Sequence, residues 1–486
     1  MRVRFAPSPT GYLHVGSART ALFNYLASRH AGGVFMLRSD DTDTARNDPH
    51  FHEDILAGLR WLGLDWDEGV ELGGPHGSYR QSDRLERYRT VAADLVQRRL
   101  AYRCFCTSDE LEARRKQARD AGNPPGYDGR CRLLDSGEAG SRAGAGERHS
   151  VRLAVARPGT TVFTDVIRGE VRFDHANVDD FVMLRSSGMP TYHLASTVDD
   201  VDYAISHVIR GEDLLPSTPK HILITCALGA KPAVYAHLPL IQGTDGRKLS
   251  KRHGDTAVRA YRDAGYLPEA VVNYLALLGW SGGGGDEETV VSLPRMVEAF
   301  RLEDVSKNPA VFDSAKLLWL NGLYIRQLPA ERFAAMAEEA AAADLGRPLN
   351  SDEQKSLLII VPLVQERVKL LTEIAGQVRF LFGDDATWDA ASWDKVMTGE
   401  TAATAVNAAI DVLDPVASWS HVAIEAALRS MLAATGLSAR KGLQPVRVAV
   451  TGSVVSPPLF ESLQALGGER TIRRLRAAAA RIAGSG

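Results

Sequence analysis

The first 38 residues contain the pattern that most restricts how this chain can fold. Residues 2–6 alternate like a strand, proline and glycine interrupt residues 7–13, and apolar side chains then recur at helical spacing over 18–26. A glycine pair at 32–33 ends the helix, and the apolar run 34–37 follows it. A strand, a crossover helix and a second strand of these lengths form a βαβ unit. We therefore predict an α/β fold with a doubly wound parallel sheet.

The sheet pattern is interrupted and then returns. Residues 78–180 are irregular, and their low-complexity stretch at 136–141 indicates an insertion with mobile loops. Beyond the insertion, residues 205–209 and 234–240 are strand-like and flank a helical segment at 219–228. The sequence thus predicts a Rossmann-type parallel sheet that is split by an insertion.

Strand signals fade after the glycine run at 282–285. Segments 331–343, 354–372 and 402–413 favour helix by composition and spacing. We therefore predict that the C-terminal third of the chain is all helical.

Composition limits the class of protein. The chain has 486 residues, of which 45% are apolar, so it is long enough for about three domains or more. Its net charge is only -3, so contact with nucleic acid would have to come from local basic patches. No stretch approaches about 18 uninterrupted apolar residues, and the N-terminus lacks an apolar secretory segment. We expect a cytoplasmic protein that does not contact membranes.

Two loops carry residues suited to a nucleotide. The sequence PSPTG at 7–11, followed by HVG at 14–16, lies between the first strand and its helix, where backbone amides and the helix N-terminus favour phosphate. The sequence KLSKR at 248–252 follows the second half of the sheet and offers two lysines to a polyanion. A lone loop histidine or lysine pair is more often ordinary surface, so the joint occurrence carries the prediction of ATP binding.

Together these loops resemble the two signature motifs of class I aminoacyl-tRNA synthetases, HIGH and KMSKS, with Ser17 in place of the last histidine of the first motif. The PSPTG segment is similar to the glutamyl and glutaminyl branch. The helical C-terminal third resembles glutamyl-tRNA synthetases of the bacterial type, because glutaminyl enzymes carry β-barrels there. A truncated relative that modifies a tRNA base lacks this helical region.

The resemblance implies a ligase that activates L-glutamate with ATP and Mg2+ to glutamyl-adenylate. The enzyme then transfers the glutamyl group to the 3′ end of the tRNA for glutamate. We expect a monomer whose partners are that tRNA, L-glutamate and ATP.

The resemblance also implies a division into domains. Residues 1–80 and 186–240 would form the two halves of the Rossmann catalytic domain, separated by a connective, acceptor-binding insertion at 81–185. Residues 241–322 would form a stem-contact domain with the KLSKR loop, and residues 323–486 the helical anticodon-binding domains.

Site residues follow from the resemblance, position by position. The catalytic residues would be His14, Gly16, Lys248 and Lys251. The residues that contact ATP would be Ser8, Thr10, His14, Gly16, Glu212 and Lys251. The residues that contact glutamate would be Arg4, Ser8, Asp40, Tyr192, Ser196 and Arg210. Arg4 and Arg210 would hold the carboxylates, which guanidinium groups suit, and Asp40 would lie near the ammonium group.

Two pocket positions depart from the common family pattern. Asp40 stands where glutamate is usual and is one methylene shorter, and Ser196 stands where asparagine is usual and offers fewer hydrogen bonds. Two alternatives therefore stay open: a non-discriminating or duplicated enzyme that charges the tRNA for glutamine with glutamate, and an inactive tRNA-binding paralogue. Asp41 and Asp43 can also be read as turn residues that cap the next helix.

Three of the four cysteines lie in one short region: Cys104, Cys106 and Cys131. This distribution suits a metal site better than a disulfide framework. With Tyr127 they resemble a zinc site of some family members in which tyrosine is the fourth ligand, while Leu133 occupies the other fourth position. Three thiolates without histidine are an incomplete ligand set, so structural Zn2+ and no metal both stay open. Cys226 is expected in a helix core.

Two features of the C-terminal third concern tRNA. Arg367 resembles an arginine that in some family members reads the third anticodon base, although exposed helical arginines are mostly solvated. The tail predicts an amphipathic helix with a basic face, which would contact tRNA phosphate or face water. The arginines of that face are Arg470, Arg473, Arg474, Arg476 and Arg481.

Overall fold

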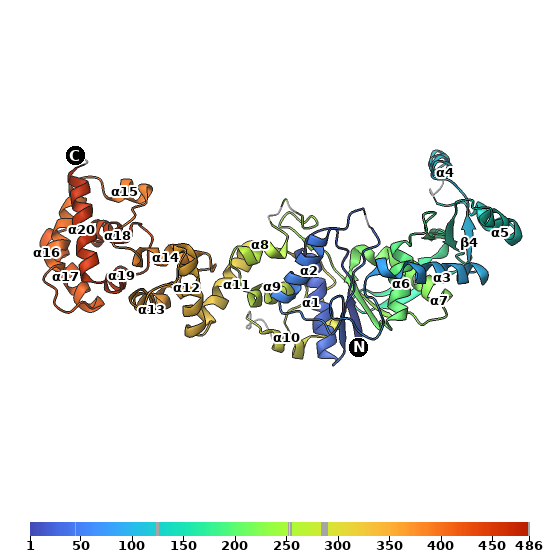
Figure 1. Ribbon diagram of the computed structural model, residues 1–486, viewed down its shortest axis with the longest axis horizontal. Helices are drawn as coiled ribbons and strands as arrows, with labels where there is room; N and C mark the ends of the chain where they lie inside the picture. The colour runs from blue at the N-terminus through green and yellow to red at the C-terminus, as the bar shows by residue number, and fades with distance from the viewer. Residues whose placement is uncertain (44, 123–125, 251, 253–254, 283–289, 485–486) are drawn as a thin grey trace. The chain divides into compact units, whose positions relative to one another are not determined.

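A computed structural model describes residues 1–486 apart from 44, 123–125, 251, 253–254, 283–289 and 485–486 (Figure 1). The chain divides into two compact units. Unit 1 consists of Met1–Tyr261 and Val271–Ser314, and unit 2 of Arg262–Ala270 and Ala315–Gly486. Within the described residues every strand belongs to unit 1.

The strands are β1 (Arg2–Phe5), β2 (Val34–Leu37), β3 (Glu68–Gly69), β4 (Ala101–Cys104), β5 (Ser150–Leu153), β6 (Thr160–Asp165), β7 (Gly169–Asp174), β8 (Val182–Leu184), β9 (His207–Gly211), β10 (Val234–Leu238), β11 (Ile241–Gln242) and β12 (Ala310–Val311). The helices of unit 1 are α1 (Val15–His30), α2 (Pro49–Trp61), α3 (Leu85–Gln97), α4 (Ser108–Asp120), α5 (Ser136–Gly144), α6 (Tyr192–Asp202), α7 (Thr218–Ala227) and α10 (Leu293–Ala299). Short 3-10 helices include η1 (Gln81–Arg84), η2 (Arg130–Leu133), η3 (His175–Asn177), η4 (Glu212–Ser217), η6 (Leu302–Asp304) and η7 (Arg379–Leu381).

The core of unit 1 is a parallel arrangement of strands. β1, β2 and β3 pair in parallel, with Arg2 opposite Val34. β9, β10 and β6 also pair in parallel, and β7 is antiparallel to β6. The two sets adjoin where the N–H of Ser206 donates to the carbonyl of Arg2 at 3.0 Å, and α1 packs on β1, β2 and β9. The predicted α/β fold is therefore confirmed, with sheets that are mixed in direction.

The insertion contains an antiparallel sheet of β4, β5 and β8. Its low-complexity stretch was predicted to be a mobile loop, and that prediction is wrong because it forms helix α5. Asp135 caps this helix by accepting from the N–H groups of Gly137 and Glu138. Arg142 also forms an ion pair with Glu147 at 2.5 Å, so side-chain contacts offset the glycines.

Helices α8 (Val258–Asp263), α9 (Pro268–Leu277) and α11 (Ser314–Gln327) have residues in both units. The other helices of unit 2 are α12 (Ala330–Leu345), α13 (Ser351–Gln365), α14 (Glu373–Val378), α15 (Ala390–Val396), α16 (Glu400–Leu413), α17 (His421–Thr435), α18 (Ala439–Thr451), α19 (Leu459–Leu466) and α20 (Gly468–Ala483). The predicted helical C-terminal third is thus confirmed.

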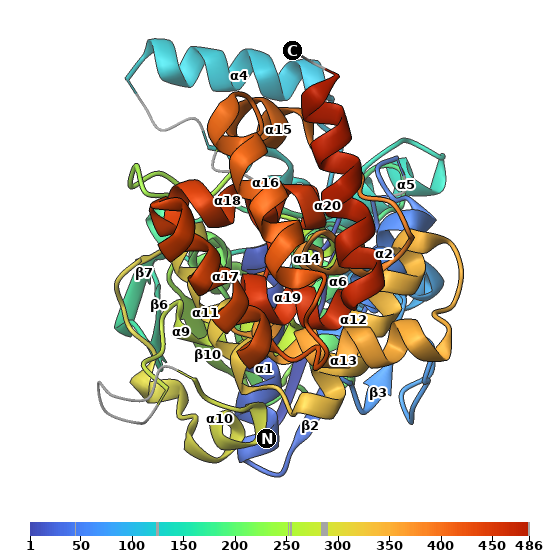
Figure 2. The ribbon, with the colours of Figure 1, turned by 90° about the vertical axis from the view of Figure 1, so that its left-hand side faces the viewer.

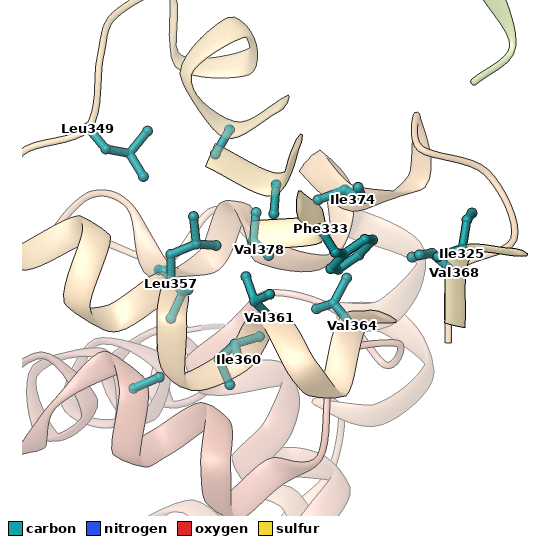
Figure 3. Packing of buried hydrophobic residues seen from close by; sticks show 14 of the residues in the cluster. Ile325, Phe333, Leu349, Leu357, Ile360, Val361, Val364, Val368, Ile374 and Val378 are labelled. Carbon is teal, nitrogen blue, oxygen red and sulfur yellow. The ribbon is translucent and has the colours of Figure 1, made fainter. Parts of the chain in front are cut away.

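Unit 2 has two apolar clusters. In the first, Phe333 of α12 packs with Val364 of α13 and Ile374 of α14 (Figure 3). The second lies among α16, α17, α18 and α20, which Figure 2 shows in orange and red. The single helix predicted over 354–372 is wrong, because α13 ends at Gln365. The backbone beyond it bonds elsewhere: the N–H of Leu371 donates to the carbonyl of Gly265 at 2.9 Å.

The tail forms α20, but its arginines do not share one free basic face. Arg474 is 1% exposed and donates to the carbonyls of Phe380 and Val450, each at 2.8 Å. Arg476 forms an ion pair with Asp414 at 3.0 Å. The predicted amphipathic helix therefore forms, but Arg474 does not belong to its exposed basic face, because backbone carbonyls of unit 2 accept hydrogen bonds from its guanidinium group.

Cys226, expected in the core, lies exposed on α7. Among the helices that the structure describes, none is both long and apolar enough to cross a membrane.

Candidate active site

A cavity of about 990 Å³ opens in unit 1 where β1 and β9 end. This is the edge of a parallel sheet at which α/β proteins bind ligands. It brings together most of the predicted site residues: Arg4, Ser8, Thr10, His14, Gly16, Asp40, Tyr192, Ser196, Arg210 and Lys248. Lys251 lies outside the described residues.

His14 is held at the N-terminus of α1. Its Nδ1 accepts hydrogen bonds from the N–H groups of Gly16 at 3.1 Å and Ser17 at 3.2 Å. The ring proton is therefore on Nε2, which lies 2.9 Å from Oγ of Ser17 and donates to it. Burial, followed by the positive charge of Lys248, lowers the pKa of His14, so the ring is neutral at pH 7.

The amides at the start of α1 already have partners in this structure. Besides the two bound to His14, the N–H of Val15 donates to the carbonyl of Thr256 at 2.8 Å. The N–H of Ala18 donates to the carbonyl of His14 at 2.9 Å. The loop therefore presents side chains to an anion, and not the free amides that the sequence suggested.

Lys248 and Glu212 have different positions relative to the cavity. Lys248 is an exposed residue of its wall, and its Nζ lies 3.2 Å from Oδ2 of Asp213. Glu212 does not line the cavity, because its carboxylate accepts from the N–H of Leu240 at 2.8 Å and pairs with Arg168. Glu212 therefore holds the backbone after β10 in place.

One buried guanidinium joins several pocket residues. Arg38, which is 0% exposed, donates to Asp40 at 2.6 Å and to Oγ of Ser196 at 3.1 Å. It also donates to Asp200 at 2.7 Å, and Asp200 pairs with Arg4 at 3.0 Å. Burial raises the pKa of Asp40, and Arg38 opposes that rise. The structure thus links Arg4, Asp40 and Ser196 through Arg38.

Neither Arg38 nor Asp200 was predicted from the sequence to be a site residue. A signal for Asp200 was present, because it follows Ser196 by four residues on α6 and so lies on the same helix face. Arg38 stands two residues before Asp40, where the strand ends, which places both side chains on one side of the backbone.

Arg210 is also buried, at 4% exposure, at the end of β9. Its Nη1 donates to the hydroxyl of Tyr192 at 3.1 Å, and its Nη2 donates to Oγ1 of Thr218 at 2.8 Å. Its Nε donates to Nε2 of His237 at 3.2 Å. Neither Thr218 nor His237 was identified from the sequence.

The three cysteines of the insertion lie together. Their Sγ atoms are within 4.8 Å of one another, and the hydroxyl of Tyr127 is 3.4 Å from Sγ of Cys104. Leu133, the other position considered, is 89% exposed. The three thiols lie close enough together to bind one metal ion, and the phenol beside them offers an oxygen as a fourth donor.

Arg367 belongs to unit 2 and follows α13. It is exposed, and its Nη1 donates to the carbonyl of Ser456 at 2.5 Å. This hydrogen bond fixes the side chain within unit 2.

Known proteins resemble this chain over its whole length. Residues 1–319 match the family model described as tRNA synthetases class I (E and Q), catalytic domain, and residues 332–479 match the anticodon binding domain. The chain is 45% identical to a protein of Moorella thermoacetica named Glutamate–tRNA ligase, covering 99% of this chain and 98% of that protein. It is 46% identical to a protein of the same name from Dehalococcoides mccartyi, with the same coverage of 99% and 98%.

A solved structure also resembles this chain over nearly its whole length. The crystal structure of a glutamate tRNA ligase from Elizabethkingia meningosepticum in complex with its amino acid matches with a TM-score of 0.88. The two chains are 32% identical, and the match covers 99% of each.

Proposed function

The chain belongs to the class I tRNA synthetases of the glutamate and glutamine branch, and we propose from this that it is a glutamate–tRNA ligase. The observation that carries the proposal is the single cavity that contains both the nucleotide motif around His14 and two buried arginines, Arg4 and Arg210. Its substrates are L-glutamate, ATP and tRNA. Members of this family use ATP with Mg2+.

The reaction has two steps. The α-carboxylate of glutamate attacks the α-phosphorus of ATP, which gives glutamyl-adenylate and releases pyrophosphate. A ribose hydroxyl of the terminal adenosine of tRNA then attacks the glutamyl carbonyl, and AMP leaves with the electron pair of the broken bond. Neither step needs a protein nucleophile.

The protein contributes position and charge. Arg4 and Arg210 hold the carboxylates of glutamate, Asp40 faces its ammonium group, and the pocket is completed by Ser8, Tyr192 and Ser196. His14, Lys248 and Lys251 act on the phosphates, and Gly16, which has no side chain, lets them approach. Ser8 and Thr10 are further positions of the ATP site, whereas Glu212 supports the site through the backbone of Leu240. Mg2+, when bound, offsets phosphate charge as the bond to pyrophosphate breaks.

In this proposal, different regions of the chain contact different parts of the tRNA. We assign the acceptor end to the insertion at 81–185, the stem to 241–322 and the anticodon to 323–486, with Arg367 as the candidate base contact. We also propose that the enzyme acts as a monomer.

The test is exchange of pyrophosphate into ATP in the presence of tRNA, with glutamate, glutamine or aspartate as the amino acid. We expect exchange with glutamate only. Aminoacylation of purified tRNAs then separates a discriminating enzyme, which charges the tRNA for glutamate alone, from one that also charges the tRNA for glutamine. Absence of exchange with every amino acid would identify an inactive paralogue.

We also propose a structural Zn2+ held by Cys104, Cys106, Tyr127 and Cys131. The supporting observation is the spacing of the three Sγ atoms, within 4.8 Å. Protein purified without added zinc should contain about one equivalent, the content of a closed structural site. Cys131→Ser should lose it and the exposed Cys226→Ser should not. A content far below one equivalent in the unmodified protein would contradict this site.

A further inference from the structure

A buried aspartate and a buried histidine lie near Arg210 and have no role so far in the proposed amino-acid and ATP site. Asp165 ends β6 in the insertion and is 1% exposed, and His237 of β10 is 0% exposed. Oδ2 of Asp165 lies 2.6 Å from Nδ1 of His237. Its other oxygen, Oδ1, accepts from the N–H groups of Ile167 at 3.0 Å and Arg168 at 2.9 Å. Oδ1 also accepts from the backbone N–H of His237 at 3.3 Å, whereas Oδ2 faces the ring of His237.

The carboxylate determines which ring nitrogen carries the proton. An ionised carboxylate only accepts hydrogen bonds, so Nδ1 of His237 must donate and Nε2 must be the acceptor. Nε2 receives the Nε–H of Arg210 at 3.2 Å and the hydroxyl of Thr218 at 3.1 Å. Thr218 in turn accepts from Nη2 of Arg210 at 2.8 Å. The hydrogen bonds therefore close a ring around one edge of the guanidinium.

The groups that touch Arg210 orient it without neutralising it. They are neutral: the ring of His237, the ring of His221 at 3.5 Å, the hydroxyls of Thr218 and Tyr192, and the carbonyl of Leu214 at 3.2 Å. Within the part of the chain that the structure describes, no carboxylate forms an ion pair with Arg210, whereas Arg4 is paired with Asp200. A buried positive charge without a counterion favours an anionic ligand.

We propose that Asp165 and His237 are positioning residues that fix the guanidinium of Arg210 and thereby set the affinity of the site for a carboxylate of the amino acid. This inference rests on the proposed function, because it takes Arg210 as a contact of glutamate. It also gives the insertion a part in amino-acid recognition, since Asp165 of β6 acts on Arg210 through His237.

The most informative variant is Asp165→Asn, because the two side chains have almost the same volume. The amide oxygen can keep the bonds to Ile167 and Arg168, but its NH2 group then faces Nδ1 of His237 and forces the ring proton onto Nε2. Two donors, Nε2–H and the Nε–H of Arg210, would face each other. We expect KM for glutamate to rise about 10- to 100-fold, the effect of losing a hydrogen bond to a charged group, while KM for ATP stays within about threefold.

The direction of the change in KM for glutamate distinguishes a positioning role of Asp165 from a purely electrostatic one. Loss of a negative charge near Arg210 would by itself favour a carboxylate and lower KM for glutamate. A lowered or unchanged KM in Asp165→Asn would therefore overturn the proposal. An equal rise in KM for ATP would overturn it as well, because that result indicates general damage to the site.

A second substitution should rescue the first. His237→Gln lacks the ring nitrogen that faces Asp165 but retains an amide oxygen that can accept from Arg210. The double variant Asp165→Asn with His237→Gln should therefore have a KM for glutamate well below that of Asp165→Asn alone, a non-additive result. A KM that equals the product of the two single effects would overturn the proposal.

If Asp165→Asn does not fold, His237→Gln and His237→Leu decide the question. The leucine side chain offers no acceptor, so KM for glutamate in His237→Leu should be about 10-fold or more above that in His237→Gln. Equal values would overturn the proposal. His175→Gln is the matched control and should not change KM, because this buried histidine contacts Thr161 on β6, away from Arg210.

Measurements on the unmodified enzyme and on Arg210→Gln distinguish a failure of the proposed function from a failure of the positioning role. No exchange in the unmodified enzyme contradicts the proposed function, and an unchanged KM in Arg210→Gln contradicts the role of Arg210. If both behave as expected and Asp165→Asn has no effect, only the positioning role fails.

Discussion

Three neighbouring acidic residues have three different environments. Asp40 lines the cavity and pairs with Arg38, whereas Asp41 accepts from the N–H and hydroxyl of Ser82 at 2.8 and 2.7 Å. Asp43 forms an ion pair with Arg46 at 2.5 Å near the surface. Only Asp40 can therefore interact directly with a ligand in the cavity, and Asp41 stabilises the start of η1.

Asp40→Asn should weaken glutamate binding selectively. It keeps the shape of the side chain but removes the negative charge that the ammonium group of glutamate needs. We expect KM for glutamate to rise about 10-fold or more, in the range for loss of a charged hydrogen-bond partner, with KM for ATP nearly unchanged. The measurement is tRNA-dependent pyrophosphate exchange at varied glutamate.

Asp43→Asn is the matched control, because it removes the same charge from an exposed pair in the same loop. It should change KM for glutamate by less than about twofold, as expected for a surface ion pair. Equal effects of the two substitutions would contradict the role of Asp40.

The sequence allowed the cavity-lining residues to be predicted, but not their partners. Arg4, Asp40 and Arg210 were predicted from the family resemblance, and each lies near the end of a strand, where a parallel sheet brings such residues to one edge. The bonds from Arg38 to Asp200 and from Arg210 to His237 join segments that lie far apart in the sequence. Such pairings depend on the register of strands and helices, which local periodicity does not specify.

The start of α13 shows how one side chain can stabilise a whole helix. Asn350 accepts from the N–H of Glu353 at 2.9 Å, and Glu353 accepts from the N–H of Asn350 at 2.9 Å, which is a capping box. Glu353 also pairs with Arg347 at 2.7 Å. The helix it begins carries Leu357, labelled in Figure 3, into the first apolar cluster of unit 2.

Glu353→Gln should destabilise unit 2 by about 1 kcal/mol, the typical value of a helix cap. The hydrogen bond from Arg347, together with that from the backbone of Asn350, lowers the pKa of Glu353 from its usual 4.5 to about 2. A lowered pKa stabilises the fold fully above pH 4.5, and the contribution is lost as pH falls from 4.5 toward 2.

Thermal unfolding across pH tests this expectation. The Tm difference between the unmodified protein and Glu353→Gln should be constant from pH 7 to about 5 and should shrink below 4.5. Asp352→Asn serves as control, because Asp352 is exposed and pairs only with Lys355 among the ion pairs of the described residues. A difference that grows toward low pH would contradict the assignment.

Elements with strong periodicity, such as the βαβ unit of β1, α1 and β2, were predictable from the sequence. Two others were not. Helix α5 contains several glycines, and its formation depends on the Asp135 cap and the Arg142 ion pair. The backbone after α13 donates hydrogen bonds to other segments, such as that from the N–H of Leu371 to the carbonyl of Gly265, which composition does not indicate.

The two units have different cores. Unit 1 contains the cavity and a core beside the sheet that includes Phe35 and Leu22. Unit 2 contains two apolar clusters, one with Phe333 and the other with Ile424. Each cluster is buried within a single unit. The length predicted about three domains or more, whereas the chain divides into two compact units. The buried position of arginines such as Arg474 was not predicted, because charge usually indicates surface.

We therefore expect two calorimetric unfolding transitions and not one. Glutamate and ATP bind to the cavity, so they should raise the Tm of the transition of unit 1 by mass action, increasingly with concentration. Glu353→Gln should lower only the other transition, because its contacts lie in unit 2. Differential scanning calorimetry measures both effects in the full chain. A single transition that responds to the ligands and to the substitution alike would contradict this view and show that the units unfold cooperatively.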